Sequence, residues 1–153
     1  MDNNKITGRF KLECHRADGS LKWATDWIKN GTTNAGKAQA ALLYGDSTAT
    51  PFTYLAVGTS STAFAASQTT LVAEITTNGL ARAAATISRV TTTVANDTYQ
   101  AVKVWTASGS LTVEEVGYFN ASSAGTMGGR ALTTTKSIVS GETLTATYQV
   151  IFA

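Results

Sequence analysis

The segment "TLTATYQVIF", Thr143–Phe152, contains the clearest strand signal in the 153-residue sequence. Apolar side chains occupy every second position, and mostly hydroxyl or amide side chains occupy the positions between them. The expected inward set is Leu144, Ala146, Tyr148, Val150 and Phe152, and the opposite set is Thr145, Thr147, Gln149 and Ile151. Because successive side chains of a strand point to opposite faces, this pattern predicts a strand with one buried face.

The same alternation occurs near the N-terminus. Phe10, Leu12 and Cys14 form the expected buried set, and the set facing water is Arg9, Lys11, Glu13 and His15. The pair Asp18-Gly19 follows and favours a primed hairpin turn. A second strand is expected over residues 21–28, with Leu21, Trp23, Thr25 and Trp27 on one face.

Further strands and one helix are expected along the rest of the chain. Residues 33–44 favour a short helix, with Asn34 as its cap and Gly45 ending it in the left-handed conformation. Turn-forming residues separate most of the remaining strands. These strands are expected at 52–57, 71–75, 80–94, 98–107, 111–120, 129–134 and 143–152.

Together these elements predict an all-β fold. Eight or nine strands with one short helix favour an antiparallel two-sheet sandwich of jelly-roll or immunoglobulin-like type. The length fits a single β-sandwich domain over residues 1–153, because a chain of this size can bury a substantial core. Residues 1–6 are expected to form a flexible N-terminal arm.

The composition excludes several classes of function. The net charge is only +2, with most charged side chains in residues 1–37, so the sequence predicts no nucleic-acid partner. No run approaches about 18 apolar residues, which predicts no membrane partner and synthesis in a cytoplasm. The rest of the surface must then consist largely of Thr, Ser, Gly, Ala and Gln, which cost little to desolvate against a protein partner.

No group of residues points to catalysis, a metal or a cofactor. Cys14 and His15 are the only cysteine and histidine, so a metal site of the usual ligand types and a Ser-His-Asp triad both lack residues. Glu114 and Glu115 are neighbours on an expected strand and would point to opposite faces, so they cannot flank one scissile bond. The sequence therefore predicts no catalytic residues, no metal, no cofactor and a protein that is not an enzyme.

Two tryptophans leave a binding role open. Trp23 and Trp27 lie four positions apart on one expected strand, which would place both rings on one face as a stacking platform for sugars. The alternative is that both rings pack in the core, as large aromatic side chains usually do. Tyr99 and Trp105 on another expected strand allow the same two interpretations.

The last two thirds of the chain, Phe52 to Ala153, resembles a known protein family. The resemblance rests on the order of "FTYLAVGTSSTAFAASQTTLVAEI", "LARAAATISRV", "LTVEEVGYFNASSAGTMGGRAL" and "SGETLTATYQVIFA". This order resembles small bacteriophage virion proteins described as capsid decoration (cement) or tail-fibre-like structural proteins. The matching positions are Gly58, Thr59, Leu71, Glu74, Arg82, Glu115, Gly117, Phe119, Gly141, Thr143 and Leu144.

The resemblance implies a non-enzymatic structural protein of the virion. The expected role is that of a cement protein that stabilises the assembled head, with the major capsid protein and further copies of itself, as a dimer or trimer, as partners. Phe64 lies on the long Ala/Ser/Thr-rich loop expected after Gly58-Thr59 and is an expected partner contact. Lys5, Arg9 and Lys11 are expected to face an acidic capsid surface. The loop could instead pack on its own sandwich.

Two alternatives stay open at this point. The first is a tail, fibre or baseplate component, which the same resemblance allows. The second is a carbohydrate-binding module built on Trp23 and Trp27, with a glycan as its ligand.

Overall fold

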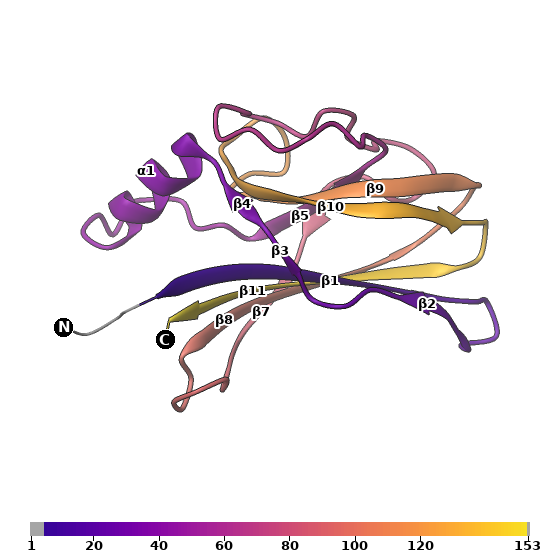
Figure 1. Ribbon diagram of the computed structural model, residues 1–153, viewed down its shortest axis with the longest axis horizontal. Helices are drawn as coiled ribbons and strands as arrows, with labels where there is room; N and C mark the ends of the chain where they lie inside the picture. The colour runs from indigo at the N-terminus through magenta and orange to yellow at the C-terminus, as the bar shows by residue number, and fades with distance from the viewer. Residues whose placement is uncertain (1–4, 153) are drawn as a thin grey trace.

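The computed structural model describes residues 5–152 and contains two antiparallel sheets that face each other. Figure 1 shows the sheets as two layers, with a short helix at one end and a long loop over the upper sheet. The predicted all-β two-sheet sandwich with one short helix is therefore confirmed.

The first sheet, called sheet A here, has β11 at its centre. Its strands run in the order β2-β1-β11-β8-β7, with β3 also paired to β1. The bounds are β1 Ile6–His15, β2 Leu21–Ala24, β3 Ile28–Lys29, β7 Thr86–Val90, β8 Thr98–Thr106 and β11 Thr143–Phe152. The pairing of β1 with β11 joins Ile6 to Phe152 and His15 to Thr143, so the first and last strands lie side by side.

The second sheet, called sheet B here, runs in the order β4-β10-β9-β5-β6. Its bounds are β4 Gly31–Thr32, β5 Tyr54–Gly58, β6 Ala83–Ala84, β9 Leu111–Phe119 and β10 Met127–Ile138. The predicted strand 129–134 is thus longer than expected at both ends. The register between β9 and β10 shifts between Leu132 and Lys136.

The core lies between the sheets. Phe10, Leu12 and Cys14 are fully buried, as are Leu144 and Ala146. The alternation predicted for β1, and for β11 up to Tyr148, is therefore confirmed. The predicted alternation is wrong at the end of β11. Phe152, expected to be buried, is 44% exposed, whereas Ile151, expected on the opposite face, is only 8% exposed. Here β11 runs past the core and towards the open end of the sandwich.

The hairpin between β1 and β2 differs from the predicted primed turn. Gly19 has a φ of 86°, but Asp18 is absent from the residues with positive φ. A type I′ turn needs positive φ at both central residues. The Gly19 N–H instead donates to the Arg16 carbonyl, and the Arg16 N–H donates to the Ser20 carbonyl. The turn is therefore a type I turn followed by a left-handed glycine.

The predicted strand over 21–28 is wrong, because it is interrupted after Ala24. The Thr25 hydroxyl accepts the Leu12 N–H at 3.0 Å, so a side chain takes the place of a ladder carbonyl. The chain then pairs with β1 again only at Ile28 and Lys29. Trp23 and Trp27 consequently do not share a strand.

Two other predicted strands are also wrong. Residues 71–75 form only an isolated bridge between Gly58 and Glu74. The segment 80–94 divides into β6 and β7, which belong to different sheets. At the break, the Ala85 N–H donates to the Thr53 carbonyl on the side of sheet B before the chain crosses to sheet A.

The helix α1, Asn34–Leu43, confirms the predicted helix, but its caps differ. Thr33 is the N-cap, and its hydroxyl accepts the Gly36 N–H at 2.9 Å. The same hydroxyl donates to the Met127 carbonyl, which ties the helix to β10. The C-cap is Tyr44, with a φ of −75°. Gly45 does not have the expected left-handed conformation, since its φ is not positive.

The predicted N-terminal arm is wrong at residue 6, since Ile6 already belongs to β1. Its pairing with Phe152 fixes it in sheet A. Residues 1–4 of the arm lie outside the described residues.

Candidate functional site

The long loop after β5 covers the outer face of sheet B (Figure 1). Under it lies a second small core, in which Leu71 of the loop packs with Ala56, Phe119 and Met127 of the sheet. Leu71 also lies directly against Gly117, where an added Cβ would come within 3.0 Å of the leucine side chain. The loop therefore packs on its own sandwich, which was the second of the two arrangements that the sequence allowed.

A buried ion pair holds this loop. Arg130 of β10 and Glu115 of β9 both have side chains with 0% exposure, and Arg130 Nε lies 2.5 Å from Glu115 Oε2. The Glu115 carboxylate also accepts the N–H groups of Val72 and Ala73, at 3.1 and 2.7 Å. A buried charge is costly unless it is paired and hydrogen-bonded, and both conditions hold here.

Arg130 reaches the other end of the loop. Its NH1 donates to the Thr62 carbonyl at 2.7 Å. The loop is bonded to the helix as well, because the Asn34 N–H donates to the Ala66 carbonyl. One arginine, one glutamate and the start of α1 thus satisfy several backbone groups of a long segment without regular secondary structure.

A second ion pair holds the segment that follows. Arg82 donates from Nε and NH2 to the two carboxylate oxygens of Glu74, at 2.9 and 2.6 Å. Its guanidinium carbon lies 3.5 Å from the centroid of the Phe119 ring. We call Glu74, Arg82, Glu115 and Arg130 together the loop clamp. Because planar guanidinium groups form bidentate pairs and stack on rings, a lysine could not replace Arg82 equally well.

Seven of the eleven positions that carry the family resemblance meet at this clamp. Glu74, Arg82 and Glu115 belong to it. Leu71, Gly117 and Phe119 form its apolar floor, and Gly58 lies so close to Glu115 that a Cβ there would overlap the carboxylate. In the sequence these residues only matched a pattern. In the fold they form one structural unit that fixes the loop.

Phe64, the predicted partner contact on this loop, is half-buried. Its ring lies over Gly31 of β4, where any Cβ would come within 3.0 Å of the ring atoms. Phe64 therefore anchors the loop within the same chain, and contact of its remaining exposed surface with a partner stays a prediction.

The predicted cationic contacts are spread along β1 and its start. Lys5 is exposed and precedes the strand. Lys11 forms a surface ion pair with Glu13 at 3.2 Å. Arg9 donates to Gln149 Oε1 at 2.9 and 2.7 Å, and Gln149 donates to Gln100. Arg9 is thus part of a polar ladder on the outer face of sheet A.

The two tryptophans have different environments. Trp23 packs against the core, and its indole N–H donates to the Ser137 carbonyl at 3.0 Å. Trp27 is 40% exposed, and its ring lies 4.1 Å from the guanidinium carbon of Arg9. Trp23 and Trp27 therefore do not form one sugar platform, and Trp27 is the more exposed of the two. Trp105 is buried in the core, and Tyr99 is half-buried and packs against it.

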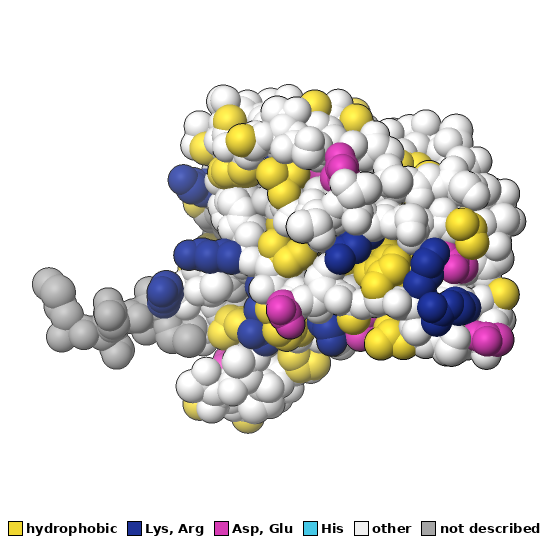
Figure 2. Space-filling view, turned by 45° about the vertical axis from the view of Figure 1, so that its right-hand side comes forward, with side chains coloured by type: hydrophobic (Ala, Val, Ile, Leu, Met, Phe, Trp, Pro, Cys, Tyr) yellow, Lys and Arg dark blue, Asp and Glu magenta, His cyan; other side chains and the backbone are white. Residues whose placement is uncertain are grey.

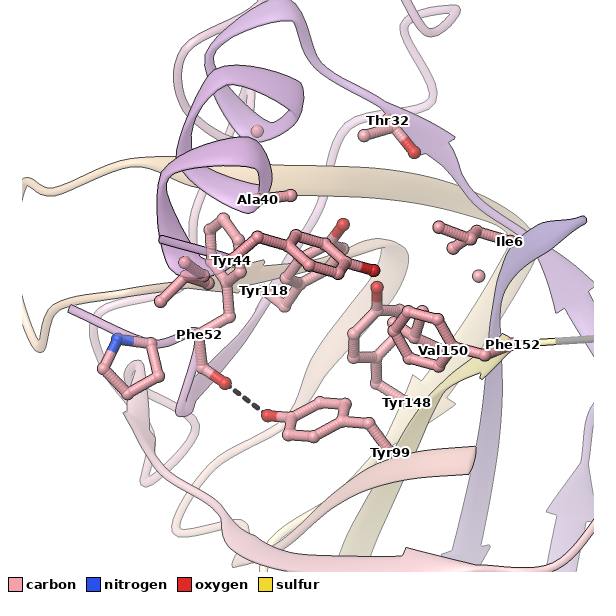
Figure 3. Close-up of a pocket in the computed structure, with 14 residues that line it drawn as sticks. Ile6, Thr32, Ala40, Tyr44, Phe52, Tyr99, Tyr118, Tyr148, Val150 and Phe152 are labelled. Carbon is pink, nitrogen blue, oxygen red and sulfur yellow. Dashed lines mark hydrogen bonds between the residues drawn. The ribbon is translucent and has the colours of Figure 1, made fainter. Parts of the chain in front are cut away.

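A pocket of about 320 Å³ opens at the end of the sandwich beside α1. Figure 3 shows that Tyr118 of sheet B approaches Tyr99 and Tyr148 of sheet A here. The Tyr118 and Tyr148 rings are stacked with centroids 4.0 Å apart. The Tyr99 hydroxyl donates to the Phe52 carbonyl. Helix α1 and the segment after it supply the outer wall, which includes Ala40 and Tyr44.

The three buried tyrosines of the pocket, Tyr99, Tyr118 and Tyr148, remain protonated at neutral pH. Burial raises the pKa of Tyr99, and it raises that of Tyr118 as well. Burial also holds the pKa of Tyr148 well above its ordinary value. The hydroxyls therefore act as neutral polar groups in an apolar wall, and the pocket suits an uncharged group.

The mouth of this pocket is surrounded by exposed apolar side chains. Ile6 is 60% exposed, Tyr44 76% and Phe152 44%. Figure 2 shows that much of the surface in view is polar and uncharged, with hydrophobic side chains in separate groups. No pattern in the sequence indicated this pocket, because its residues come from strands of both sheets and from the helix.

The candidate acid–base residues do not converge. Glu115 belongs to the loop clamp, whereas Glu114 accepts from the Thr135 hydroxyl at the surface. His15 is partly exposed on β1. No group of three or more His, Cys, Asp or Glu side chains arranged to hold a metal occurs within residues 5–152. Over the same residues, no helix is both long and apolar enough to cross a membrane.

The buried thiol of Cys14 gives a direct test of the packing. Burial, together with the nearby Glu142 carboxylate, raises its pKa to about 11. At pH 8 only about one thiol in a thousand is then a thiolate, against about one in ten for a thiol of pKa 9. We expect Ellman's reagent to label the native protein at least about a hundredfold more slowly than the urea-unfolded chain. Equal labelling rates would contradict the buried position of Cys14.

Comparison with protein-family models, curated proteins and solved structures found no match.

Proposed function

We propose that this chain is a non-enzymatic structural protein of a bacteriophage virion that binds and stabilises the assembled head as a cement protein. The observation that carries the proposal is the loop clamp. Seven of the eleven positions through which the sequence resembles such virion proteins meet in one place, and there they fix a long polar loop over sheet B.

The physical chemistry of the surface supports this proposal. A cement protein gains its effect from contact area repeated by symmetry, so it needs a rigid surface that is cheap to desolvate. The loop provides uncharged Ser, Thr and Ala side chains on a backbone that the clamp holds still. Little ordering entropy would then be lost when a partner covers the loop.

The test is binding to empty heads. Purified protein is mixed with heads of the source phage that lack it, and the particles are sedimented. We expect co-sedimentation at a fixed, high copy number, with an increase in the temperature at which the heads disrupt. Heads that remain bare at saturating protein would refute the cement role. A cryo-EM map of the virion that places the chain in the tail, fibre or baseplate would support that alternative.

A second candidate function has one specific observation in its favour. The Trp27 ring contacts the Arg9 guanidinium, which bonds to Gln149 of the polar ladder, so an exposed ring adjoins amide and guanidinium groups as in a sugar-binding face. Under this alternative, a glycan array should show a ligand that is lost in Trp27→Ala and kept in Trp23→Phe. No bound glycan, or one retained by Trp27→Ala, would remove this candidate.

A further inference from the structure

The pocket at the end of the sandwich is large enough for one aromatic side chain. Its volume of about 320 Å³ is at the lower end of ligand pockets, so it suits one ring better than a lipid chain. Most of its wall consists of aromatic and aliphatic groups, which pack against a ring edge to face or with an offset stack. The neutral hydroxyls of the wall offer hydrogen bonds to a polar atom on that ring.

The exposed apolar rim of the pocket favours a protein partner over a free small molecule. Ile6, Tyr44 and Phe152 keep much of their surface in water around the mouth. A small molecule inside the pocket would leave that surface exposed. A protein segment that inserts one side chain would cover the rim as well, and burial of that apolar surface would add to the affinity.

The charges beside the mouth indicate the chemistry of the partner. Lys5 precedes Ile6, Lys37 follows Gly36, and Lys29 lies three positions before Thr32, so each cation is close in sequence to a lining residue. All three lysines are exposed, and the ion pairs found among residues 5–152 include none of them. Figure 2 shows Lys and Arg side chains at the end that carries the N-terminus.

Two acidic residues also lie close to lining residues of the pocket, and their carboxylates accept hydrogen bonds from neutral groups. Asp46, two positions after Tyr44, accepts the N–H and hydroxyl of Thr48. Asp97 accepts the N–H groups of Thr92, Thr93 and Val94. These neutral donors leave both carboxylates charged, but the three lysines outnumber them, so the net field that an approaching segment meets favours carboxylates.

From these observations we infer that the end pocket binds a tyrosine or other single-ring side chain from an acidic segment of a protein partner. The ring fills the cavity between the sheets, and the carboxylates beside it face Lys5, Lys29 and Lys37. This assignment does not depend on the virion role, because it uses only the pocket, its rim and its charges.

The test uses the whole protein and four probes. These are p-cresol and three capped pentapeptides: Glu-Asp-Tyr-Asp-Glu, its uncharged form Gln-Asn-Tyr-Asn-Gln, and Glu-Asp-Ala-Asp-Glu. Binding is followed by NMR of the methyl groups of Ile6, Ala40 and Val150, which all line the pocket. We expect the acidic tyrosine peptide to shift these signals and to bind about tenfold more tightly than its uncharged form, since tenfold is a modest gain for several screened charges. The alanine peptide should leave the signals unchanged.

Two variants of α1 form a matched pair. Ala40 lines the pocket and is exposed, so Ala40→Phe should fill the mouth without removing any packed group. Ala38 is exposed two positions earlier, on the opposite side of the helix, and does not line the pocket. We expect Ala40→Phe to abolish the shifts caused by p-cresol and by the peptide, and Ala38→Phe to preserve both. A melting curve for each variant shows that it is folded.

The charge of the partner is tested separately with Lys5→Gln/Lys37→Gln. This double variant should weaken binding of the acidic peptide several-fold and leave binding of p-cresol unchanged. If p-cresol enters the pocket but no tyrosine peptide does, the site takes a free aromatic molecule and the inferred partner is wrong. If the acidic and uncharged peptides bind with equal affinity, the inference that the partner segment is acidic is wrong. If no probe shifts the pocket signals, the site itself is refuted.

Discussion

Replacing Arg130 by methionine is expected to lower the free energy of unfolding by about 3–5 kcal/mol, the usual cost of removing one partner of a buried ion pair. Glu115 would keep its bonds to the Val72 and Ala73 N–H groups but lose its counter-charge in a site with 0% exposure. The Thr62 carbonyl would lose its donor as well. Urea unfolding followed by tryptophan fluorescence measures the change, and limited proteolysis should find new cleavage near Thr62.

The control for this prediction is Arg89→Met on the exposed edge strand β7, which should change stability by less than about 0.5 kcal/mol. The double variant Arg130→Met/Glu115→Gln should regain part of the loss, because it removes the uncompensated buried charge. An effect of Arg130→Met no larger than that of Arg89→Met would show that the loop does not depend on the ion pair.

Replacing Gly36 by alanine is expected to destabilise the protein by about 1–3 kcal/mol, the cost of overpacking a tight site. Helix propensity alone predicts the opposite sign, since alanine is favoured over glycine within a helix by about 1 kcal/mol. The position is special because α1 contacts β10 there. A Cβ on Gly36 would lie well under 3.0 Å from the backbone of Gly128, which cannot move without shifting the sheet.

Gly45→Ala is the matched control. Gly45 lies just after the helix, its φ is not positive, and no atom lies within 4 Å of the place that an alanine methyl group would take. This substitution should leave stability unchanged or raise it by up to about 1 kcal/mol. Thermal denaturation of both variants by circular dichroism measures the difference. Stabilisation by Gly36→Ala would mean that the helix does not press against β10 as described.

The sequence predicted the strands whose two faces have different environments. β1 and most of β11 alternate because one side packs in the core and the other carries Arg9, Thr145 and similar side chains. The segments predicted wrongly all use their backbone in ways that alternation does not reveal. Leu12 bonds to the Thr25 side chain, and the N–H groups of Val72 and Ala73 bind a carboxylate instead of a neighbouring strand.

The candidate sites were predictable to different degrees. The prediction that Glu114 and Glu115 point apart held, but the partner of Glu115 could not be found from spacing. Arg130 is fifteen positions away, and the bond depends on how β9 and β10 pair. The end pocket had no signal at all, because Tyr99, Tyr118 and Tyr148 become neighbours only when two sheets pack together.

The central position of β11 also has a consequence for biosynthesis. β1 and β8 each pair with β11, and β1 pairs with it along ten successive residue positions, so neither strand has its main partner until Phe152 has been made. Pairing between segments so distant in sequence is slow, because loop closure costs entropy before the contacts form. A nascent chain that stops short of β11 would therefore expose the apolar faces of β1 and β8 to chaperones and to other nascent chains.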